Sequence, residues 1–259
     1  MRAILVSQHG GPEVLAITEL PDPEPAPGEV IVETAAIGVN LADVVERTGS
    51  GRVRSPSSPA TKGVGTVCEV GQEVPRIRSG DLVAWAWPGV PSGYAERVAV
   101  PAQWVLPLPP GIAPETAAAA LIQGMTAHYL SEAAYRVQPG DTVLVHAGAG
   151  GVGLLLTQMA TLRGGRVICT VSTAQKEKLA RDNGAAEVIR YTETDFAAEV
   201  ARLTAGAAWP RSTTALGARP STATWQASRY AAYWRSTARL AAPYHQSTRL
   251  GSSRSAPST

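Results

Sequence analysis

The sequence predicts an α/β fold with a parallel, doubly wound sheet, and two apolar runs carry that prediction. The run at 142–146 leads into a glycine-rich turn, after which apolar residues recur at helical spacing from Gly151 to Leu162. Gly164 and Gly165 end this helix, and a second β-branched run follows at 166–171. A strand, a helix and a strand in this order are typical of a βαβ unit.

The following residues predict one more strand and two more helices. We expect helices at about 174–183 and 195–203 and a short strand at 187–189. No later segment has the β-branched runs that further parallel strands need. The sequence therefore predicts about three strands, which is part of a doubly wound (Rossmann) domain.

The turn after the first strand has the form of a dinucleotide-binding site. Gly148, Gly150 and Gly153 give the pattern G-x-G-x-x-G. Glycines let the backbone approach a pyrophosphate closely, and a helix that begins at Gly151 and Val152 directs free N–H groups at the anion. The alternative is a glycine-rich turn in some other α/β protein.

The residues after the second strand indicate which dinucleotide would bind. A site for NAD usually has Asp or Glu about 20 residues after the glycine motif. Here Ser172 and Thr173 stand at that place, with Lys176 one helical turn later. Two hydroxyls and an ammonium suit a 2′-phosphate, so we expect NADPH. The alternative is that Ser172 caps a helix and Lys176 is a solvated charge.

Residues 1 to about 206 resemble a known family. The segments that carry the resemblance are 8–15, 28–32, 38–43, 93–96 and 123–130, together with the glycine motif and Tyr191. They resemble the zinc-free, NADPH-dependent quinone oxidoreductases related to zeta-crystallin, in the medium-chain dehydrogenase/reductase superfamily. The resemblance implies a GroES-like, mostly β substrate domain at 1–122. It also implies a partial NADP-binding Rossmann domain at 123–208.

The resemblance also implies a reaction and its residues. Hydride would pass from NADPH to a quinone or another conjugated carbonyl in the cleft between the domains. Thr126 would lie near the nicotinamide carboxamide, and Lys176 and Tyr191 near the 2′-phosphate. Asn40 would donate a hydrogen bond to a quinone oxygen, and Asp43 would be a structural or orienting group. Without the resemblance, Asn40 would only end a strand, and Thr126 would only cap or line a helix.

The sequence gives no sign of a zinc site. Zinc-dependent relatives use cysteine and histidine ligands and a lobe with four cysteines, whereas this chain has two isolated cysteines, Cys68 and Cys169. Asn40 stands where zinc enzymes of the superfamily have a cysteine. The four histidines lack ligand spacing, and we expect His128 and His146 to be packed or hydrogen-bonded in the core.

Composition sets the remaining expectations. No run of about 18 apolar residues and no signal peptide is present, so we expect a cytoplasmic protein without a membrane span. The net charge of +2 conceals an asymmetry, because residues 209–259 hold seven arginines and no acidic residue. We expect this segment to be a disordered basic tail.

Two segments depart from the family pattern. Relatives carry an apolar-Pro-Gly-x-Glu-Gly segment where this chain has residues 57–63, and three further βα steps after about residue 207. Plausible GC-rich codons for the family residues, started one base late, spell both Ser57–Lys62 and Ser212–Gly217. We therefore hypothesise reading-frame shifts at about 51–63 and from about 208. The alternative is a genuine Ser- and Arg-rich tail and a Pro-Ser loop.

Several functions follow from these observations. The leading one is a reductase whose turnover is impaired by the departures from the family pattern. Relatives dimerise through a sheet edge in the missing part, so we do not expect a dimer. The alternatives are an NADPH-binding pseudoenzyme, an enoyl or alkenal reductase, and a protein that binds nucleic acid through the basic tail and its aromatic residues. We regard nucleic-acid binding as the weakest of these.

Overall fold

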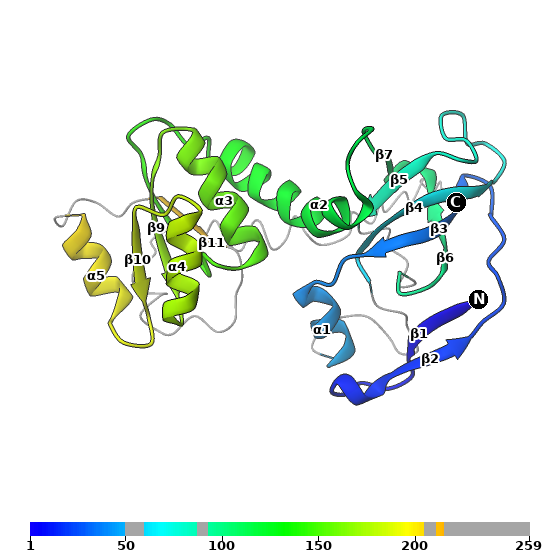
Figure 1. Cartoon of the computed structure of the whole chain (residues 1–259), viewed down its shortest axis with the longest axis horizontal. Coiled ribbons are helices and arrows are strands. Elements are labelled where there is room, and N and C mark those ends of the chain that lie inside the picture. Colours follow the sequence, from blue (N-terminus) through cyan, green and yellow to red (C-terminus); the bar gives the residue numbers. More distant parts are fainter. Residues whose placement is uncertain (50–59, 87–92, 205–210, 215–259) are drawn as a thin grey trace, which may run out of the picture.

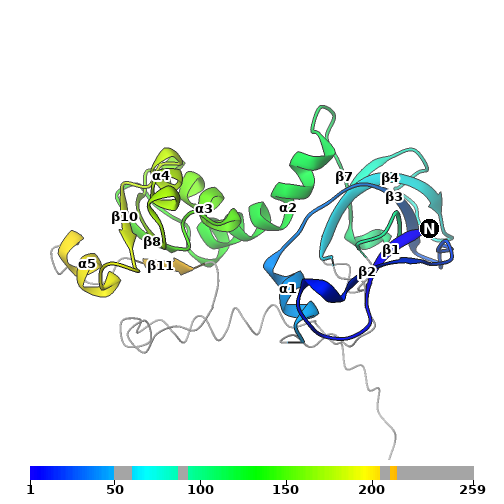
Figure 2. The same cartoon turned by 60° about the horizontal axis from the view of Figure 1, so that its bottom comes forward.

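Two lobes make up the described part of the chain, and one helix joins them. The computed structural model describes residues 1–49, 60–86, 93–204 and 211–214. In Figures 1 and 2 the long helix α2 (Pro114–His128) lies between a lobe built mainly of strands and a lobe in which strands alternate with helices. This arrangement confirms the predicted α/β class, with a β-rich domain ahead of a parallel sheet.

The first lobe contains an antiparallel sheet of five strands in the order β6-β3-β4-β5-β7. These strands are β3 (Glu29–Ile37), β4 (Lys62–Val70), β5 (Leu82–Ala86), β6 (Arg97–Pro101) and β7 (Val105–Pro107). Strands β1 (Arg2–Val6) and β2 (Leu15–Glu19) pair with each other. The helix α1 (Leu41–Arg47) follows β3, and short 3-10 turns occupy Pro12–Val14 and Ala102–Trp104.

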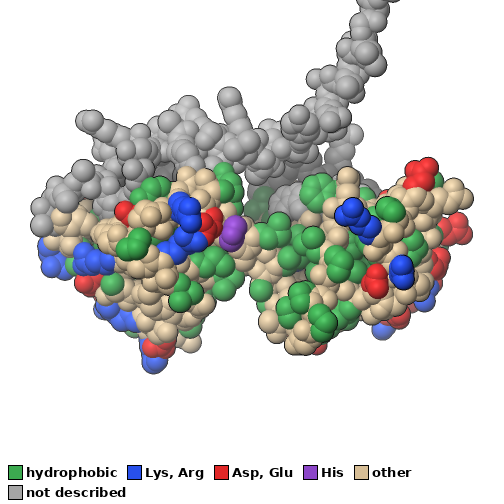
Figure 3. Space-filling model, turned by 90° about the horizontal axis from the view of Figure 1, so that it is seen from above, with side chains coloured by type: hydrophobic (Ala, Val, Ile, Leu, Met, Phe, Trp, Pro, Cys, Tyr) green, Lys and Arg blue, Asp and Glu red, His purple; other side chains and the backbone are tan. Residues whose placement is uncertain are grey.

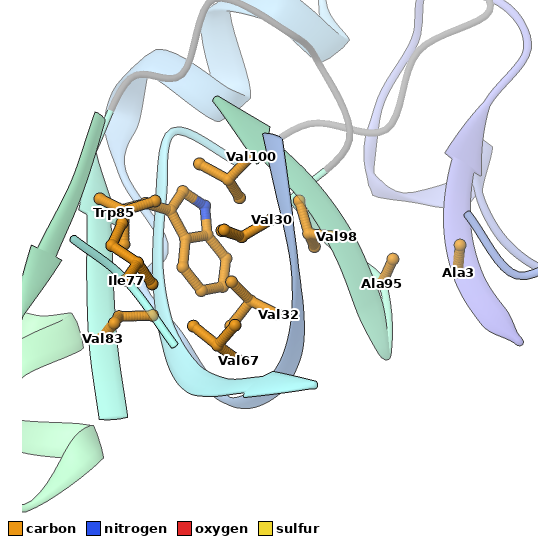
Figure 4. Close-up of a cluster of buried hydrophobic side chains, with 11 residues drawn as sticks. Ala3, Val30, Val32, Val67, Ile77, Val83, Trp85, Ala95, Val98 and Val100 are labelled. Atoms are coloured by element: carbon orange, nitrogen blue, oxygen red, sulfur yellow. The ribbon is translucent and has the colours of Figure 1, made fainter. Parts of the chain in front are cut away.

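Trp85 lies at the centre of the first lobe's core. Its side chain is fully buried, and Figure 4 shows the indole ring among valines of the surrounding strands, including Val30 and Val67. Gly63 is the partner of Trp85 on the neighbouring strand. A β-carbon at Gly63 would lie 2.3 Å from Trp85 Cζ2, so the ring occupies space that any larger residue would need.

The second lobe holds a parallel sheet of four strands in the order β10-β9-β8-β11. The strands are β8 (Thr142–His146), β9 (Arg166–Val171), β10 (Glu187–Arg190) and β11 (Arg211–Thr214). The helices are α3 (Gly151–Leu162), α4 (Ala174–Asp182) and α5 (Phe196–Leu203). The first three strands and the three helices confirm the predicted elements, and no bound differs by more than one residue.

Both faces of the parallel sheet are covered because its strands are apolar on both sides. Val143 and Val167 belong to the cluster on one face, which includes Leu156 of α3. Leu144 and Ile168 alternate with them and pack on the opposite face with residues of α5. The continuous apolar runs of β8 and β9 follow from this double burial.

Helix α2 contacts both lobes. Ala117 and Ala118 pack with Val64 and Ala84 of the first lobe, whereas Ala127 belongs to the core of the parallel sheet. A π-helical turn at Tyr129–Ala134 continues the helix. The domain boundary expected between residues 122 and 123 falls within α2, so a division at that point stays a prediction.

Strand β11 corrects the expectation of three strands and lies inside the tail that we expected to be disordered. It pairs in parallel with β8, with Arg211 opposite Val143 and Thr214 opposite His146. Its four residues have no apolar run, so backbone pairing defines the strand. Of the two segments with proposed frame shifts, 51–63 and from about 208, the structure describes residues 60–63 and 211–214, and the rest lies outside the described residues. None of the helices that the structure describes has the length and apolar character needed to cross a membrane.

Candidate active site

A tight glycine turn connects β8 to α3. Ala147 takes a left-handed conformation with φ of 52°, and the Gly150 N–H donates to the Ala147 carbonyl at 2.8 Å. The Gly148 N–H donates to the Thr170 carbonyl of β9 at 3.0 Å, which fixes the turn against the neighbouring strand. Gly150 is the N-cap of α3, so the first turn of that helix begins directly at the carboxyl end of β8.

Two of the three motif glycines are required by close packing. A β-carbon at Gly148 would lie 2.5 Å from both Cβ and Sγ of Cys169, and one at Gly153 would lie 2.3 Å from the Ala147 carbonyl oxygen. Only a hydrogen therefore fits at Gly148, which faces β9, and at Gly153, where α3 approaches the turn. The N–H groups of Gly151, Val152 and Gly153 have no acceptor within the helix, because the first turn of a helix supplies none. This arrangement fits a pyrophosphate, whose charge the helix N-terminus favours.

The second part of the site lies at the carboxyl ends of β9 and β10. Ser172 follows β9, and its hydroxyl accepts a hydrogen bond from Lys176 Nζ at 3.2 Å. Tyr191 follows β10; its N–H donates to the Val171 carbonyl at 3.1 Å, and its side chain is 51% exposed. The structure thus brings Ser172 and Lys176 together and places Tyr191 on the adjoining strand end.

The alternative role for Ser172, as the cap of a helix, is wrong. The N-cap of α4 is Thr173, whose hydroxyl accepts from the Lys176 backbone N–H at 3.3 Å. Glu177, an acidic residue in the first turn of α4, forms ion pairs with Arg181 at 2.9 Å and Arg190 at 3.1 Å. The Ser172 hydroxyl and the Lys176 ammonium thus lie at the position where an NAD site has a carboxylate, which would repel a 2′-phosphate.

In the first lobe, Asp43 organises the start of α1. One oxygen of its buried carboxylate accepts hydrogen bonds from the Asn40 N–H at 2.6 Å and from the Tyr94 hydroxyl at 3.0 Å. Burial and the Asp43 charge raise the pKa of Tyr94, which keeps that phenol protonated as a donor. Asp43 thus has the contacts of an orienting group that holds the backbone of Asn40.

The side chain of Asn40 links the first lobe to α2 through hydrogen bonds. Its Nδ2 donates to Thr61 Oγ1 at 2.6 Å, and its Oδ1 accepts from Gln123 Nε2 of α2 at 3.0 Å. Lys62 Nζ donates to Gln123 Oε1 and to the Ala119 carbonyl, the latter at 2.9 Å. Lys62 is 1% exposed, and burial lowers its pKa.

Sequence reasoning did not identify Thr61, Lys62 or Gln123 as members of this site. Lys62 begins a strand of mostly small and apolar residues. A charged residue in such a run was the feature of the sequence that could have indicated a buried polar contact. Its partner Gln123 is 61 positions away, beyond the reach of any local pattern. The methylene Cγ of Gln123 would lie 3.0 Å from a β-carbon at Gly151, so Gln123 also touches the glycine turn.

Thr126 lies one helical turn after Gln123 in α2. Its hydroxyl donates to the Ile122 carbonyl at 2.7 Å, so at present its proton is used within the helix. The hydroxyl oxygen can still accept a hydrogen bond. A contact between Thr126 and a nicotinamide carboxamide stays a prediction.

The two histidines that we expected in the core differ. His146 is half-buried at the end of β8, where Nδ1 lies 2.9 Å from Thr170 Oγ1 and the ring packs edge-on against Phe196. Burial lowers its pKa. His128 is exposed at the end of α2, so the expectation for it was wrong. Across the described ranges, no three His, Cys, Asp or Glu residues are grouped so that they could hold a metal ion.

A hollow of about 380 Å³ adjoins the hydrogen bonds of Asn40. It lies where β3, β4 and α2 meet, and Figure 3 shows the two lobes separated by a notch in the described surface. Its lining comprises Ala36, Ile37, Gly38, Val39, Lys62, Glu115, Ala118, Ala119 and Gln123. The hollow thus brings residues of the first lobe together with the helix that reaches the glycine turn.

Comparisons with known proteins agree with this architecture. Residues 26–110 match the model of the alcohol dehydrogenase GroES-like domain, and residues 151–233 match that of the zinc-binding dehydrogenases. The second match continues past residue 208, into the segment that we expected to be foreign to the family.

Relatives match most of this chain but extend beyond it. A quinone oxidoreductase of Pseudomonas aeruginosa is 40% identical over 210 residues, which cover 81% of this chain and 64% of the relative. A 2-haloacrylate reductase of a Burkholderia species is 33% identical, with 79% and 63% covered. The crystal structure of Escherichia coli quinone oxidoreductase with NADPH superimposes with a TM-score of 0.77 at 38% identity, covering 80% of this chain and 63% of that one. The chain therefore spans less than two thirds of the length of these relatives. By these matches, the chain belongs to the quinone oxidoreductase group of the medium-chain dehydrogenase/reductase superfamily.

Proposed function

We propose that the chain is an NADPH-dependent reductase that transfers hydride, without zinc, to a quinone or another conjugated carbonyl. The observation that carries the proposal is the pair formed by Ser172 and Lys176 at the end of β9, in the same sheet as the glycine turn from which α3 begins. The NADPH in the related Escherichia coli structure supports the same cofactor here.

The binding residues would divide the cofactor among them. The N–H groups of Gly151, Val152 and Gly153 would hold the pyrophosphate, with Gly148 and Gly150 shaping the turn. Lys176 and Ser172 would bind the 2′-phosphate through an ammonium and a hydroxyl, and the exposed Tyr191 ring would cover that end. When bound, NADPH would supply the hydride.

The protein's own contribution to the chemistry would be orientation and polarisation. Asn40 Nδ2 carries two hydrogens, of which one is donated to Thr61. The other could be donated to the acceptor's carbonyl oxygen, on which negative charge develops as hydride arrives at the conjugated carbon. A fixed donor stabilises that charge more in the transition state than in the ground state. Thr126 would orient the nicotinamide, and Asp43 would keep the backbone of Asn40 in place.

A second acceptor class has support of its own. The 2-haloacrylate reductase relative acts, by its name, on an electron-poor alkene conjugated to a carboxylate. An enone or enoate would present the same oxygen to Asn40 and the same electron-poor carbon to the hydride. Cytoplasmic location and the absence of a dimer stay predictions for this chain.

Steady-state oxidation of NADPH tests the proposal. Duroquinone and 2-cyclohexenone represent the two acceptor classes, and neither contains a group that requires a metal. We expect NADPH oxidation that depends on the acceptor and that is weaker with NADH. NADPH binding without turnover on either acceptor would identify a pseudoenzyme, and absence of NADPH binding would refute the proposal entirely.

A further inference from the structure

Four side chains form a continuous series of hydrogen bonds from Lys62 to Thr61. Lys62 donates to Gln123 Oε1; Gln123 Nε2 donates to Asn40 Oδ1 at 3.0 Å; and Asn40 Nδ2 donates to Thr61 Oγ1 at 2.6 Å. Lys62 and Thr61 are neighbours in the first lobe, whereas Gln123 belongs to α2. The series therefore starts and ends on one segment and passes through the helix that joins the lobes.

The direction of every bond in the series follows from Lys62. An ammonium has three donors and no acceptor, so Gln123 must turn its oxygen toward Lys62. The Gln123 NH₂ group then faces Asn40, which must present its own oxygen. The Asn40 NH₂ group is left on the opposite side, as a donor. Two amides that could each adopt either orientation are thus restricted to one.

Packing keeps Lys62 in this position. Its side chain is 1% exposed, and its second donor is satisfied by the Ala119 carbonyl at 2.9 Å. A β-carbon at Gly38 would lie 2.1 Å from Lys62 Cε, so the glycine at the end of β3 leaves room for the lysine stem. Lys62 cannot withdraw to solvent without losing both acceptors, which makes the orientation costly to reverse.

The Asn40 NH₂ group lies beside Gly38, which lines the hollow, although Asn40 itself is not among the lining residues. The second hydrogen of Nδ2 has the Gly38 carbonyl at 3.5 Å, the limit of a hydrogen bond, and Gly38 lines the hollow together with Lys62 and Gln123. A carbonyl oxygen of a small molecule in the hollow could replace that weak contact with a stronger one.

We propose that Lys62 is a positioning residue that, through Gln123, holds the Asn40 amide with its NH₂ group toward the acceptor's carbonyl oxygen. This role rests on the proposed reductase function and on Thr61 and Lys62 as the sequence gives them, within the segment at 51–63 where relatives carry a glutamate in place of Lys62 and where we hypothesise a frame shift. Lys62 does not touch the substrate in this arrangement. Lys62 determines whether the carbonyl oxygen of the substrate meets the NH₂ group or the oxygen of the Asn40 amide. It therefore selects ligands with an exposed carbonyl oxygen.

Gln123→Glu is the most direct test, because it keeps the size of the side chain and replaces the NH₂ donor that faces Asn40 with an oxygen acceptor. Both carboxylate oxygens accept, so one would pair with Lys62 and the other would face Asn40. Asn40 would then have to turn its NH₂ group toward residue 123 and its oxygen toward the hollow. Gln158→Glu is the matched control, since Gln158, at an exposed position of α3, donates through Nε2 to Asn183 Oδ1 in the same way.

Nuclear magnetic resonance of the Asn40 side-chain amide measures the orientation whether or not the chain turns over. Thr61→Val removes the acceptor that Asn40 uses now. We expect Thr61→Val to shift the Asn40 NH₂ signals in the wild-type and Gln158→Glu backgrounds and to leave them nearly unchanged in Gln123→Glu. Equal shifts in all three backgrounds would overturn the proposal. Lys62→Met, which removes the fixed donor, should give two sets of Asn40 signals; one unchanged set would likewise overturn it.

Kinetics separate this proposal from the proposed function. In Gln123→Glu, kcat/KM for duroquinone at saturating NADPH should fall by about 10- to 100-fold, the effect of one misplaced hydrogen bond. An unchanged kcat/KM together with a reversed Asn40 amide would overturn the catalytic part of the role. Failure of the wild type to reduce any acceptor would refute the reductase function, while the resonance experiment would still decide the orientation.

Discussion

Replacing Gly153 with alanine tests the geometry of the glycine turn most sharply. The new β-carbon would begin 2.3 Å from the Ala147 carbonyl oxygen and 2.9 Å from the backbone of Gly148. Since β-carbons essentially never approach other heavy atoms closer than 3.0 Å, α3 must move away from β8 by about 0.7 Å. The obstacles are backbone atoms, so no side-chain rotation can relieve them.

The expected magnitudes follow from that displacement. Overpacking of this kind costs about 1–3 kcal/mol, and the better helix propensity of alanine returns about 1 kcal/mol. The free energy of unfolding should therefore fall by up to about 2 kcal/mol. The N–H groups at the start of α3 move with the helix, so NADPH affinity should fall by about tenfold or more, which corresponds to about 1.4 kcal/mol.

Urea unfolding and fluorescence titration with NADPH measure the two effects. Gly124→Ala in α2 is the control for stability, because a β-carbon there meets nothing within 4 Å. That substitution should leave the free energy of unfolding unchanged or raise it by up to about 1 kcal/mol. If Gly153→Ala bound NADPH as tightly as the wild type and unfolded at the same urea concentration, the close approach of α3 to the turn would be refuted.

Three further predictions concern the cofactor, pH and the core. Lys176→Glu should weaken NADPH binding by about tenfold or more and leave NADH binding within about twofold, because only NADPH presents a 2′-phosphate to the new carboxylate; equal losses for both cofactors would show that Lys176 does not read that phosphate. Burial lowers the pKa of His146 below its ordinary 6.5, so the unfolded state binds the proton more readily, and the free energy of unfolding should fall as pH drops below about 6.5. Urea titrations should show a shallower fall in His146→Gln, and an identical pH dependence would contradict the assignment. Trp85→Ala should cost about 3–5 kcal/mol in urea unfolding, because the indole is fully buried, and a loss below about 1 kcal/mol would contradict its central place in the core.

Much of the parallel sheet could be predicted because its signals are local. Strands β8 and β9 are apolar on both faces, and the helix between them begins at a glycine turn and ends at a pair of glycines. The predicted bounds of all three elements therefore agree with the structure. The 2′-phosphate end was also predictable, since Ser172 and Lys176 are four residues apart on one strand–helix junction.

The remaining features depend on contacts between distant segments. Strand β11 has four polar residues and is defined only by its pairing with β8, so no hydrophobic pattern could indicate it. The hydrogen-bond partner of Lys62 is Gln123 on α2. Because that contact depends on how α2 packs against β4, no local sequence pattern indicates it. His128 carries an apolar sequence context yet lies on the exposed side of α2, because the hydrophobic pattern of that helix is shared between two lobes.

The relative affinity of the chain for NADPH and NADH tests the central claim most directly. Both cofactors can be titrated by fluorescence against the wild-type chain and against Ser172→Ala. We predict that the wild type binds NADPH at least about tenfold more tightly than NADH, and that Ser172→Ala reduces this preference through NADPH alone. Equal affinity for the two cofactors, or tighter binding of NADH, would contradict the assignment of Ser172 and Lys176 to a 2′-phosphate site.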